Sequence, residues 1–562
     1  MGVQGRPSAR LVTAEEISAH RSLDDLWLVV DGVVYDLSEF ARQHPGGAGV
    51  LLRHAGRDAT VAYSEVHAPS LIRLTLPEAR RIGVLDESST TTTATIEDRA
   101  RPPPLTRGEG EGEGKGKEEE EEPPPPPTPT ISSAKANKGA AKPPPPLSSL
   151  INAHDFRLAA QQSYTPKAWA FLTSAATDCL TMERNSSAYS RIGLRPRVLR
   201  DVSAALVDLS TTILGSRVRA PLFVAPTSMG RLFHPEGERE LGRGAQRLGI
   251  PQCVSTSCSF PLPEIMDAVE AEAEAEAEAG AGAGAGAGTN EDGMTAPAPA
   301  PAPVPVPVFF QLYVDKDRRK SEALLRLVGA RGVKAVFVTV DAPVIGKREA
   351  DERLRADEGM QLPMSGMTAR NDGKGGSLGR IMGHFIDASL TWDDVAWLRT
   401  AAPGLPIVLK GIQTAMDAVR AMEVGVEAIY ISNHGGRSLD TAPATILVLL
   451  ELQKCCPQVF DRMEVYIDGG ITRGTDIFKA LCLGARAVGI GRGFLFALNY
   501  GKDGVERFVN ILTDELETTM QQCGITSLDQ VHPGLLHTGA VDHLVPGSEE
   551  HPYAKWKPRG KL

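Results

Sequence analysis

The chain has 562 residues, 42% of them hydrophobic, and a formal net charge of -10, so it can build about two to four domains with buried cores. The acidic balance argues against a nucleic-acid-binding protein held by phosphate contacts. No apolar run is long enough to span a membrane, and the seven Cys lack both C-x-x-C spacing and the density of a disulfide scaffold. We therefore expect no membrane span, no structural zinc and a reducing compartment.

Two low-complexity tracts carry most of the acidity. One contains Gly-Glu repeats, a run of five Glu and three Pro clusters, and the other consists of Glu-Ala, Ala-Gly and Ala-Pro repeats. Such compositions cannot bury enough apolar surface to offset the entropy lost on ordering. The predicted organisation is a foldable block at residues 8–86, a disordered acidic and Pro-rich hinge at 87–150, a large block at 151–545 with a low-complexity insertion at 270–307, and a tail at 546–562.

The N-terminal block begins with a predicted β-hairpin, because residues 27–35 read WLVVDGVVY, two apolar runs around an Asp-Gly turn. An HPGG turn then starts at His44, and His67 follows 23 residues later. Two imidazoles held on a rigid backbone across a slot between helices suit a six-coordinate haem iron. The alternative for a lone HPGG is a surface turn with an uninvolved His.

The HPGG turn, the LSEF segment before it and the GRDAT segment after it resemble the cytochrome b5-type haem domain over most of residues 10–86. The resemblance implies that His44 and His67 are the axial ligands of the haem iron. Because no C-x-x-C-H occurs, the haem b should be held non-covalently. With both axial positions filled, such a haem transfers electrons and does not bind oxygen.

The large block alternates short apolar runs with helical stretches. Continuous Val- and Ile-rich runs are typical of parallel strands covered on both faces, and eight of them predict an α/β fold, a (β/α)₈ TIM barrel. Polar residues follow the ends of the runs, so they should converge on the rim where barrel active sites form. The predicted strands lie at residues 221–227, 252–256, 309–314, 335–343, 406–411, 427–436, 465–470 and 487–493.

The sharpest local signal is SNHGGR, which places His434 and Arg437 three residues apart on a glycine-rich loop. A general base beside a bidentate carboxylate clamp is what the oxidation of a 2-hydroxy acid needs, and the alternative is an ordinary polar loop. Glycine-rich turns after the last two predicted strands favour a phosphate site there.

Together the SNHGGR, TVDAP, LKG and DGG…GxGR motifs resemble the FMN-dependent 2-hydroxy acid dehydrogenase and oxidase family. The order haem domain, hinge and flavin barrel is similar to the flavocytochrome b2 family. The resemblance implies FMN and haem b as cofactors, oxidation of an L-2-hydroxy acid, foremost L-lactate to pyruvate, and electron transfer to a cytochrome c-type acceptor. It also implies a homotetramer in the mitochondrial intermembrane space, but because the first residues make a poor transit peptide, the cytoplasm is an equal alternative.

The resemblance also assigns roles to single residues. It implies His434 as the catalytic base, Asp341 as the partner of its imidazolium form, and Tyr313 as the hydrogen-bond partner of the substrate hydroxyl. Arg437 and Arg348 are then expected to bind the substrate carboxylate. The residues expected to bind FMN are Thr227, Ser255, Gln311, Thr339, Lys410, Asp468, Arg473, Gly491 and Arg492, and Lys410 also counts as catalytic because a cation there stabilises reduced flavin.

Three departures from the family pattern affect these expectations. Phe171 stands where the family usually has a Tyr that contacts the substrate carboxylate. Thr472 replaces the first Arg of DGG-x-R-R-G, which weakens one phosphate contact or leaves it to Arg473. Ser228 and Ser257 stand where the substrate side-chain pocket is sized, and both are small and polar, which leaves the substrate side chain open.

Two other functions stay open. An oxidase would pass electrons from flavin to oxygen, as the long hinge and Phe171 suggest, and a non-catalytic redox sensor would bind haem and flavin with weakened chemistry. We also expect the insertion to lie on the N-terminal face of the barrel, because it connects a helix to a strand. The partly Gly-rich residues 349–380 follow the fourth predicted strand and are expected to form a mobile lid.

Overall fold

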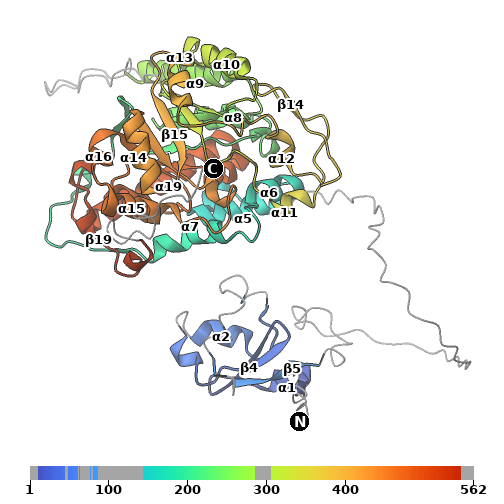
Figure 1. Ribbon diagram of the computed structural model, residues 1–562. Helices are drawn as coiled ribbons and strands as arrows, with labels where there is room; N and C mark the ends of the chain where they lie inside the picture. Colours follow the sequence, from blue (N-terminus) through green and yellow to red (C-terminus); the bar gives the residue numbers. More distant parts are fainter. Residues whose placement is uncertain are drawn as a thin grey trace, which may run out of the picture. The chain divides into compact units, whose positions relative to one another are not determined.

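A computed structural model of the chain describes residues 10–44, 48–60, 63, 72, 76, 77, 80–86, 143–284 and 306–545 (Figure 1). The chain divides into two compact units, Met1–Ile131 and Ser132–Leu562, and each is described by itself. The tail, His67 and the predicted hinge as far as residue 142 lie outside the described residues, so the bounds of the hinge and the tail stay predictions. None of the described helices is long and apolar enough to cross a membrane.

The N-terminal unit is built on a five-stranded sheet with the strand order β1-β5-β4-β3-β2. The predicted hairpin is confirmed, because β3 pairs antiparallel with β4 across Asp31 and Gly32, whose φ values are 51° and 72°. Positive φ at both central residues is the geometry of the two-residue turn that matches the twist of the strands. The elements are β1 (Leu11–Val12), α1 (Ala14–Ala19), β2 (Arg21–Ser22), β3 (Asp25–Val30), β4 (Val33–Asp36), α2 (Ala48–His54) and β5 (Arg81–Leu85).

Alternating side chains of β3 give this sheet two different cores. Leu28 and Val30 join an apolar cluster on one face, whereas Val29 joins a smaller cluster with Val34 on the other. This follows from the period of two along a strand, which sends successive side chains to opposite faces. The first cluster also contains Ala41 and Ala55, which flank the HPGG turn in sequence.

The second unit contains a closed barrel of eight parallel strands, which confirms the predicted TIM barrel. Each of the eight predicted runs overlaps one strand, and β18 pairs with β9 through Val488 and Leu222 to close the barrel. The strands are β9 (Leu222–Val224), β10 (Gln252–Ser255), β11 (Val308–Leu312), β12 (Val336–Thr339), β15 (Ile407–Ile412), β16 (Ala428–Ile431), β17 (Glu464–Ile467) and β18 (Ala487–Ile490).

Helices alternate with these strands and surround the barrel (Figure 1), so that nearly every strand residue is buried. Inside the barrel the rings of Phe223, Phe309, Phe337, Tyr430 and Tyr466 pack against one another, so the barrel is a filled core. The alternating helices include α8 (Gly237–Arg247), α9 (Leu262–Gly284), α10 (Arg318–Ala330), α13 (Asp394–Ala401), α14 (Ala415–Val424), α15 (Thr445–Cys455), α17 (Gly474–Cys482), α18 (Arg492–Ala497) and α19 (Gly501–Gln522), and α5 (Ala153–Ser163), α6 (Pro166–Thr173) and α7 (Leu180–Ser190) precede the barrel.

The low-complexity insertion begins as a helix. The Glu-Ala repeats continue α9, and residues 285–305 lie outside the described part of the chain. Because the insertion connects α9 to the start of β11, it enters the barrel from the N-terminal face. Glu272 in the repeats contacts Arg247 at 2.8 Å and Lys502 at 3.1 Å, so the first part of the insertion is tied to α8 and α19.

The segment after β12, predicted as a mobile lid, is folded against the barrel. It contains α11 (Glu349–Glu352), the short antiparallel strands β13 (Gln361–Leu362) and β14 (Met367–Thr368), and α12 (Leu378–Met382). α11 packs against α6, and both lie side by side in Figure 1.

Candidate active site

The carboxyl ends of the barrel strands bring the predicted catalytic residues together. The Nδ1 atom of His434 lies 3.0 Å from Oδ1 of Asp341, and its Nε2 atom lies 3.2 Å from the hydroxyl of Tyr313. These three residues follow β16, β12 and β11, so three separate strands build the group. One imidazole nitrogen thus has a carboxylate partner, and the other is directed toward the hydroxyl that can meet a substrate.

The local backbone explains how the imidazole is held. His434 has a positive φ of 59°, and its backbone N–H donates to Ser432 Oγ at 3.1 Å. A bulge in β15 brings Gly411, with φ of 116°, against Asp341, where an added Cβ would lie 2.5 Å from the Cβ of Asp341. Only glycine therefore fits beside the carboxylate at this point.

Burial and charge set the protonation states of this pair. Burial lowers the pKa of His434 below its ordinary value, although Asp341 opposes the shift. Burial alone would raise the pKa of Asp341, but His434 and Lys410 outweigh it and hold the pKa of Asp341 below its usual range. The pair thus combines a neutral imidazole with a charged carboxylate near neutral pH, as a general base requires.

Lys410 places a buried cation at the bottom of the site. Its Nζ donates to Ser432 Oγ at 3.2 Å, and its side chain is almost fully buried. Burial would lower the pKa of Lys410, but the carboxylates of Asp341 and Asp468 outweigh it and raise the pKa above its ordinary value. The ammonium is therefore charged over the whole physiological pH range.

Three arginines gather on the other side of the site. Arg437 donates to the carbonyls of Phe171 and Leu172 at 2.9 and 3.0 Å, and Arg492 donates to the carbonyl of Leu172 at 3.1 Å. The guanidinium carbons of Arg437 and Arg348 lie 5.0 and 5.9 Å from the ring centre of Phe171. Phe171 therefore offers its ring to two cations, a favourable arrangement for an aromatic face.

Burial and mutual repulsion lower the pKa values of these arginines, which indicates that they form an anion site. Burial, followed by the like charges of Arg348 and Arg492, lowers the pKa of Arg437 well below its ordinary value. Burial, with the charge of Arg348, lowers the pKa of Arg492 to about 10. A bound anion removes this repulsion, so the group suits a carboxylate or a phosphate.

The residues expected on the flavin face form a connected row. Ser255 Oγ donates to Gln311 Oε1 at 2.9 Å, and Gln311 Nε2 donates to Thr339 Oγ1 at 2.9 Å. The row crosses the ends of β10, β11 and β12. Thr227 follows β9, which lies between β10 and β18 in the barrel, and its Cγ2 atom is 3.7 Å from a Cβ added at Gly491.

Two observations test whether this rim fits FMN. Asp468 Oδ1 is buried without a hydrogen-bond partner, and burial raises the pKa of Asp468, so the carboxyl lacks the donor that a ribityl hydroxyl would supply. A Cβ added at Gly491 would meet no atom other than that of Thr227 within 4 Å, so open space lies over this glycine. The residues present therefore fit FMN, and Lys410 and the Gln311 row are the residues that would hold its ring.

Arg473, predicted to bind FMN, has an acidic partner in the structure, and its role in FMN binding stays a prediction. Its guanidinium pairs with Glu515 of α19 at 2.8 Å, and its side chain is about half exposed. Thr472 donates through its backbone N–H to Asp476 at 3.0 Å, within the first turn of α17. Among the predicted phosphate residues, Arg492 and Gly491 remain at the rim.

The N-terminal unit presents one of the two predicted haem ligands. His44 is half-buried at the HPGG turn, and its ring meets that of Phe40 edge to face, with centroids 5.9 Å apart. The apolar cluster that contains Leu28 and Tyr35 lies on one face of the sheet. An imidazole near an apolar core fits a haem held non-covalently, and His67 lies outside the described residues.

Sequence reasoning missed several groups that hold the catalytic side chains in place. The carbonyls of Phe171 and Leu172 fix Arg437, and Lys167 fixes the segment after β12. Ser432, inside the SNHGGR motif, bonds both His434 and Lys410, and its place just before the His was an available signal.

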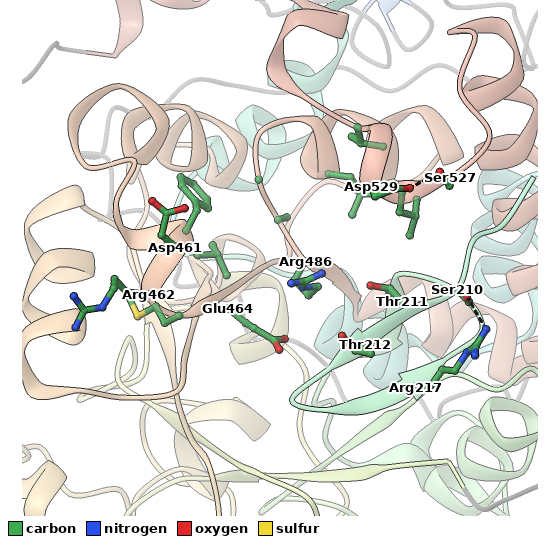
Figure 2. A pocket seen from close by; sticks show the side chains of 18 of the residues that line it. Ser210, Thr211, Thr212, Arg217, Asp461, Arg462, Glu464, Arg486, Ser527 and Asp529 are labelled. Carbon is green, nitrogen blue, oxygen red and sulfur yellow. Dashed lines mark hydrogen bonds between the residues drawn. The ribbon is translucent and has the colours of Figure 1, made fainter. Parts of the chain in front are cut away.

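A cavity of about 810 Å³ lies far from this chemistry, at the N-terminal face. Its lining includes Glu464, the first residue of β17, and Arg486, which directly precedes β18; Figure 2 shows both with Thr211 of the β7–β8 hairpin (Thr211–Ile213 and Ser216–Val218). Because catalytic groups of such barrels lie at the carboxyl ends of the strands, we assign it no part in the reaction.

The barrel rim carries a His–Asp base and an arginine cluster, and the N-terminal unit carries a candidate haem ligand. Together they are typical of an oxidoreductase with two cofactors. The family model for FMN-dependent dehydrogenase matches residues 160–538, and that for the cytochrome b5-like heme/steroid binding domain matches residues 13–86. The chain belongs to the FMN-dependent dehydrogenase family and carries a cytochrome b5-like domain before its barrel. FMN and haem b are its cofactors.

Two curated relatives differ in how much of the chain they match. The L-lactate dehydrogenase (cytochrome) of Saccharomyces cerevisiae is 36% identical over 531 residues, which cover 93% of this chain and 79% of that protein. A peroxisomal (S)-2-hydroxy-acid oxidase of Oryza sativa subsp. japonica is 38% identical over 389 residues, which cover 68% of this chain and 94% of that protein. The first relative thus matches most of the chain, and the second about two thirds of it.

Solved structures agree with this relationship. The flavin-binding domain of baker's yeast flavocytochrome b2 aligns with a TM-score of 0.58 and 37% identity, covering 74% of this chain and 95% of that one. A mandelate oxidase with (S)-4-hydroxymandelic acid aligns with a TM-score of 0.58 and 30% identity, covering 69% of this chain and 98% of that one.

Proposed function

We propose that the protein oxidises L-lactate to pyruvate and passes the electrons through haem b to a cytochrome c-type acceptor. The observation that carries this proposal is the His434–Asp341 pair facing Tyr313 at one barrel rim, in a chain that also has a cytochrome b5-like domain. The likeness to the L-lactate dehydrogenase (cytochrome) of yeast over most of the chain supports the same substrate and acceptor.

The arginine cluster orients the substrate. The carboxylate of a 2-hydroxy acid binds between Arg437 and Arg348, whose planar guanidinium groups can each donate two parallel hydrogen bonds. The hydroxyl then points to Tyr313 and to Nε2 of His434, which already lie within hydrogen-bond distance of each other. Fixing the acid at both ends supplies the orientation that the reaction needs.

Proton removal falls to His434. Its neutral Nε2 accepts a proton from the substrate, and the buried carboxylate of Asp341 stabilises the imidazolium that forms. Bound FMN supplies a two-electron acceptor and bound haem b a one-electron relay. Lys410 holds a positive charge beside the flavin site, which favours the reduced, negatively charged ring.

Further parts of the proposal rest on the family. We propose a homotetramer that works with a soluble cytochrome in the mitochondrial intermembrane space or the cytoplasm. Ser228 and Ser257 border the place of the substrate side chain, so acids larger than lactate are natural competitors for the site.

Rapid mixing with L-lactate tests the proposal, with flavin and haem absorbance followed separately. Fast flavin reduction followed by haem reduction supports it, and flavin reduction without haem reduction contradicts the electron-transfer part. Measuring cytochrome c reduction and peroxide yield together distinguishes a dehydrogenase from an oxidase that reduces oxygen. A panel of 2-hydroxy acids with larger side chains decides whether lactate is preferred.

A variant of the base completes the test. H434Q keeps a polar side chain but cannot accept a proton, so kcat should fall by roughly 10²- to 10⁴-fold. The flavin absorption spectrum should be unchanged, because His434 lies on the substrate side of the site. Turnover at the wild-type rate would contradict the assigned base.

A further inference from the structure

Lys167 of α6 holds together both ends of the segment that follows β12. Its Nζ lies 2.5 Å from Asp351 Oδ1, 2.7 Å from the carbonyl of Asp351, 2.8 Å from that of Gly376 and 2.9 Å from that of Leu354. An ammonium has three donors, so these four acceptors use its whole capacity. The side chain of Lys167 is only 14% exposed, which makes this a largely desolvated contact.

Asp351 completes the contact from the other side. Its second oxygen accepts from Ser377 Oγ at 3.1 Å and from the backbone N–H of Gly379 at 3.4 Å, and both Asp351 and Ser377 are fully buried. A buried carboxylate is stable only when it is paired and hydrogen-bonded, so Asp351 depends on Lys167. The pair therefore connects α11 to the start of α12.

Arg348 lies between the parts that this pair connects. It precedes Asp351 by three residues, directly before α11, and a Cβ added at Gly379 would lie 1.8 Å from its Nη2 atom. Its Nε atom is buried without a hydrogen-bond partner, so packing holds the guanidinium. The other packing surface is the ring of Phe171, one helical turn after Lys167 on the same face of α6.

We propose that Lys167 and Asp351 are positioning residues for Arg348. By fixing α6 against the segment after β12, they hold the guanidinium between Phe171 and Gly379, ready for the carboxylate of the 2-hydroxy acid. Both residues act through Arg348, and we assign neither of them a contact with substrate or cofactor. The inference rests on the proposed function only in the identity of the acid, because any carboxylate substrate of this site needs the same arginine.

The test is steady-state kinetics of K167M in the full-length protein loaded with both cofactors. KM for the 2-hydroxy acid should rise so that kcat/KM falls roughly 10- to 100-fold. The kcat value should change much less, because K167M disturbs the arginine that binds the substrate carboxylate and leaves the base that accepts the proton in place. The acid limb of the kcat profile should not move. An unchanged KM would contradict the proposal.

A second variant separates positioning from folding. K167M leaves Asp351 buried without its cation, whereas K167M/D351N removes both charges and keeps the hydrogen-bonding shape of the carboxylate. The double variant should regain thermal stability but keep the raised KM. K479M is the matched control. Lys479, on α17, is another largely buried lysine, and its Nζ donates to the carbonyl of Tyr189 at 2.9 Å. Replacing Lys479 should leave KM unchanged.

A double-mutant comparison shows whether Lys167 acts through Arg348. In the background of R348M, adding K167M should cause little further rise in KM or in the dissociation constant of pyruvate measured by flavin absorbance. Independent, multiplicative effects would overturn the proposal. If the wild type fails to oxidise L-lactate, the proposed function fails, but pyruvate titration or another acid from the panel still tests the positioning role.

Discussion

Asp341 Oδ1 lies 3.0 Å from Nδ1 of His434, and the carboxylate is fully buried while a quarter of the imidazole side chain stays exposed. This contact fixes the ring orientation and directs Nε2 to the open side of the site, where Tyr313 lies. It also raises the pKa of an imidazole that burial lowers.

Removing the charge of Asp341 should therefore move the pH dependence of turnover. In D341N the pKa of His434 loses its raising contribution and falls further, so the acid limb of kcat/KM shifts to lower pH. The base is neutral above its pKa, so the plateau at higher pH remains but lies roughly 10²-fold or more lower, since the imidazolium is no longer stabilised. A pH series of kcat/KM measures both effects, and a shift to higher pH would contradict the assignment.

Replacing Arg437 separates charge from geometry. R437K keeps a cation but loses the planar fork that donates to a carboxylate and to the carbonyls of Phe171 and Leu172. We expect a KM for L-lactate roughly 10- to 100-fold higher, because a charge-assisted bidentate contact is lost. The Tm of R437K should be measured beside its kinetics, because a large drop in Tm would mean that the end of α6 has moved.

Haem binding should depend on His44 and His67, whereas the rate at which L-lactate reduces the flavin should not. In H44A or H67A, reduction of cytochrome c by L-lactate should be nearly abolished while flavin reduction in rapid mixing keeps its wild-type rate. H54A, which changes another His of the same unit, is the control and should retain haem absorbance. Wild-type haem content in either ligand variant would refute the assignment of that ligand.

The first part of the insertion, which contains Glu272, should contribute to stability, whereas residues 285–303 should be dispensable for both stability and turnover. Replacing residues 285–303 with a Gly-Ser linker of equal length should leave turnover within about twofold, because loop length and composition on this face have small energetic effects. Deleting residues 272–303 should also spare turnover but lower the free energy of unfolding by about 0.5–2 kcal/mol, because Arg247 and Lys502 lose their partner Glu272. Denaturant unfolding and kinetics of the two folded, FMN-loaded variants distinguish these outcomes.

Local patterns were enough to find the barrel and most of its rim. A strand buried on both faces must be apolar along its length, so an apolar run such as 406–411 predicts a strand at that place. An Asp-Gly pair between two apolar runs likewise predicts the hairpin of β3 and β4. His434, Asp341 and Tyr313 lie at or near the ends of predicted runs, and strand ends of a parallel barrel must share one rim. Their individual roles came from the resemblance of the motifs to a known family.

Contacts between distant segments were decided by the tertiary structure alone. Arg473 pairs with Glu515 of α19, 42 positions away, and the order of residues does not predict such a partner. Lys167 likewise meets Asp351 across 184 positions, because α6 packs on α11. A strand or turn follows from its own residues, whereas an ion pair depends on which surfaces the packed core brings together.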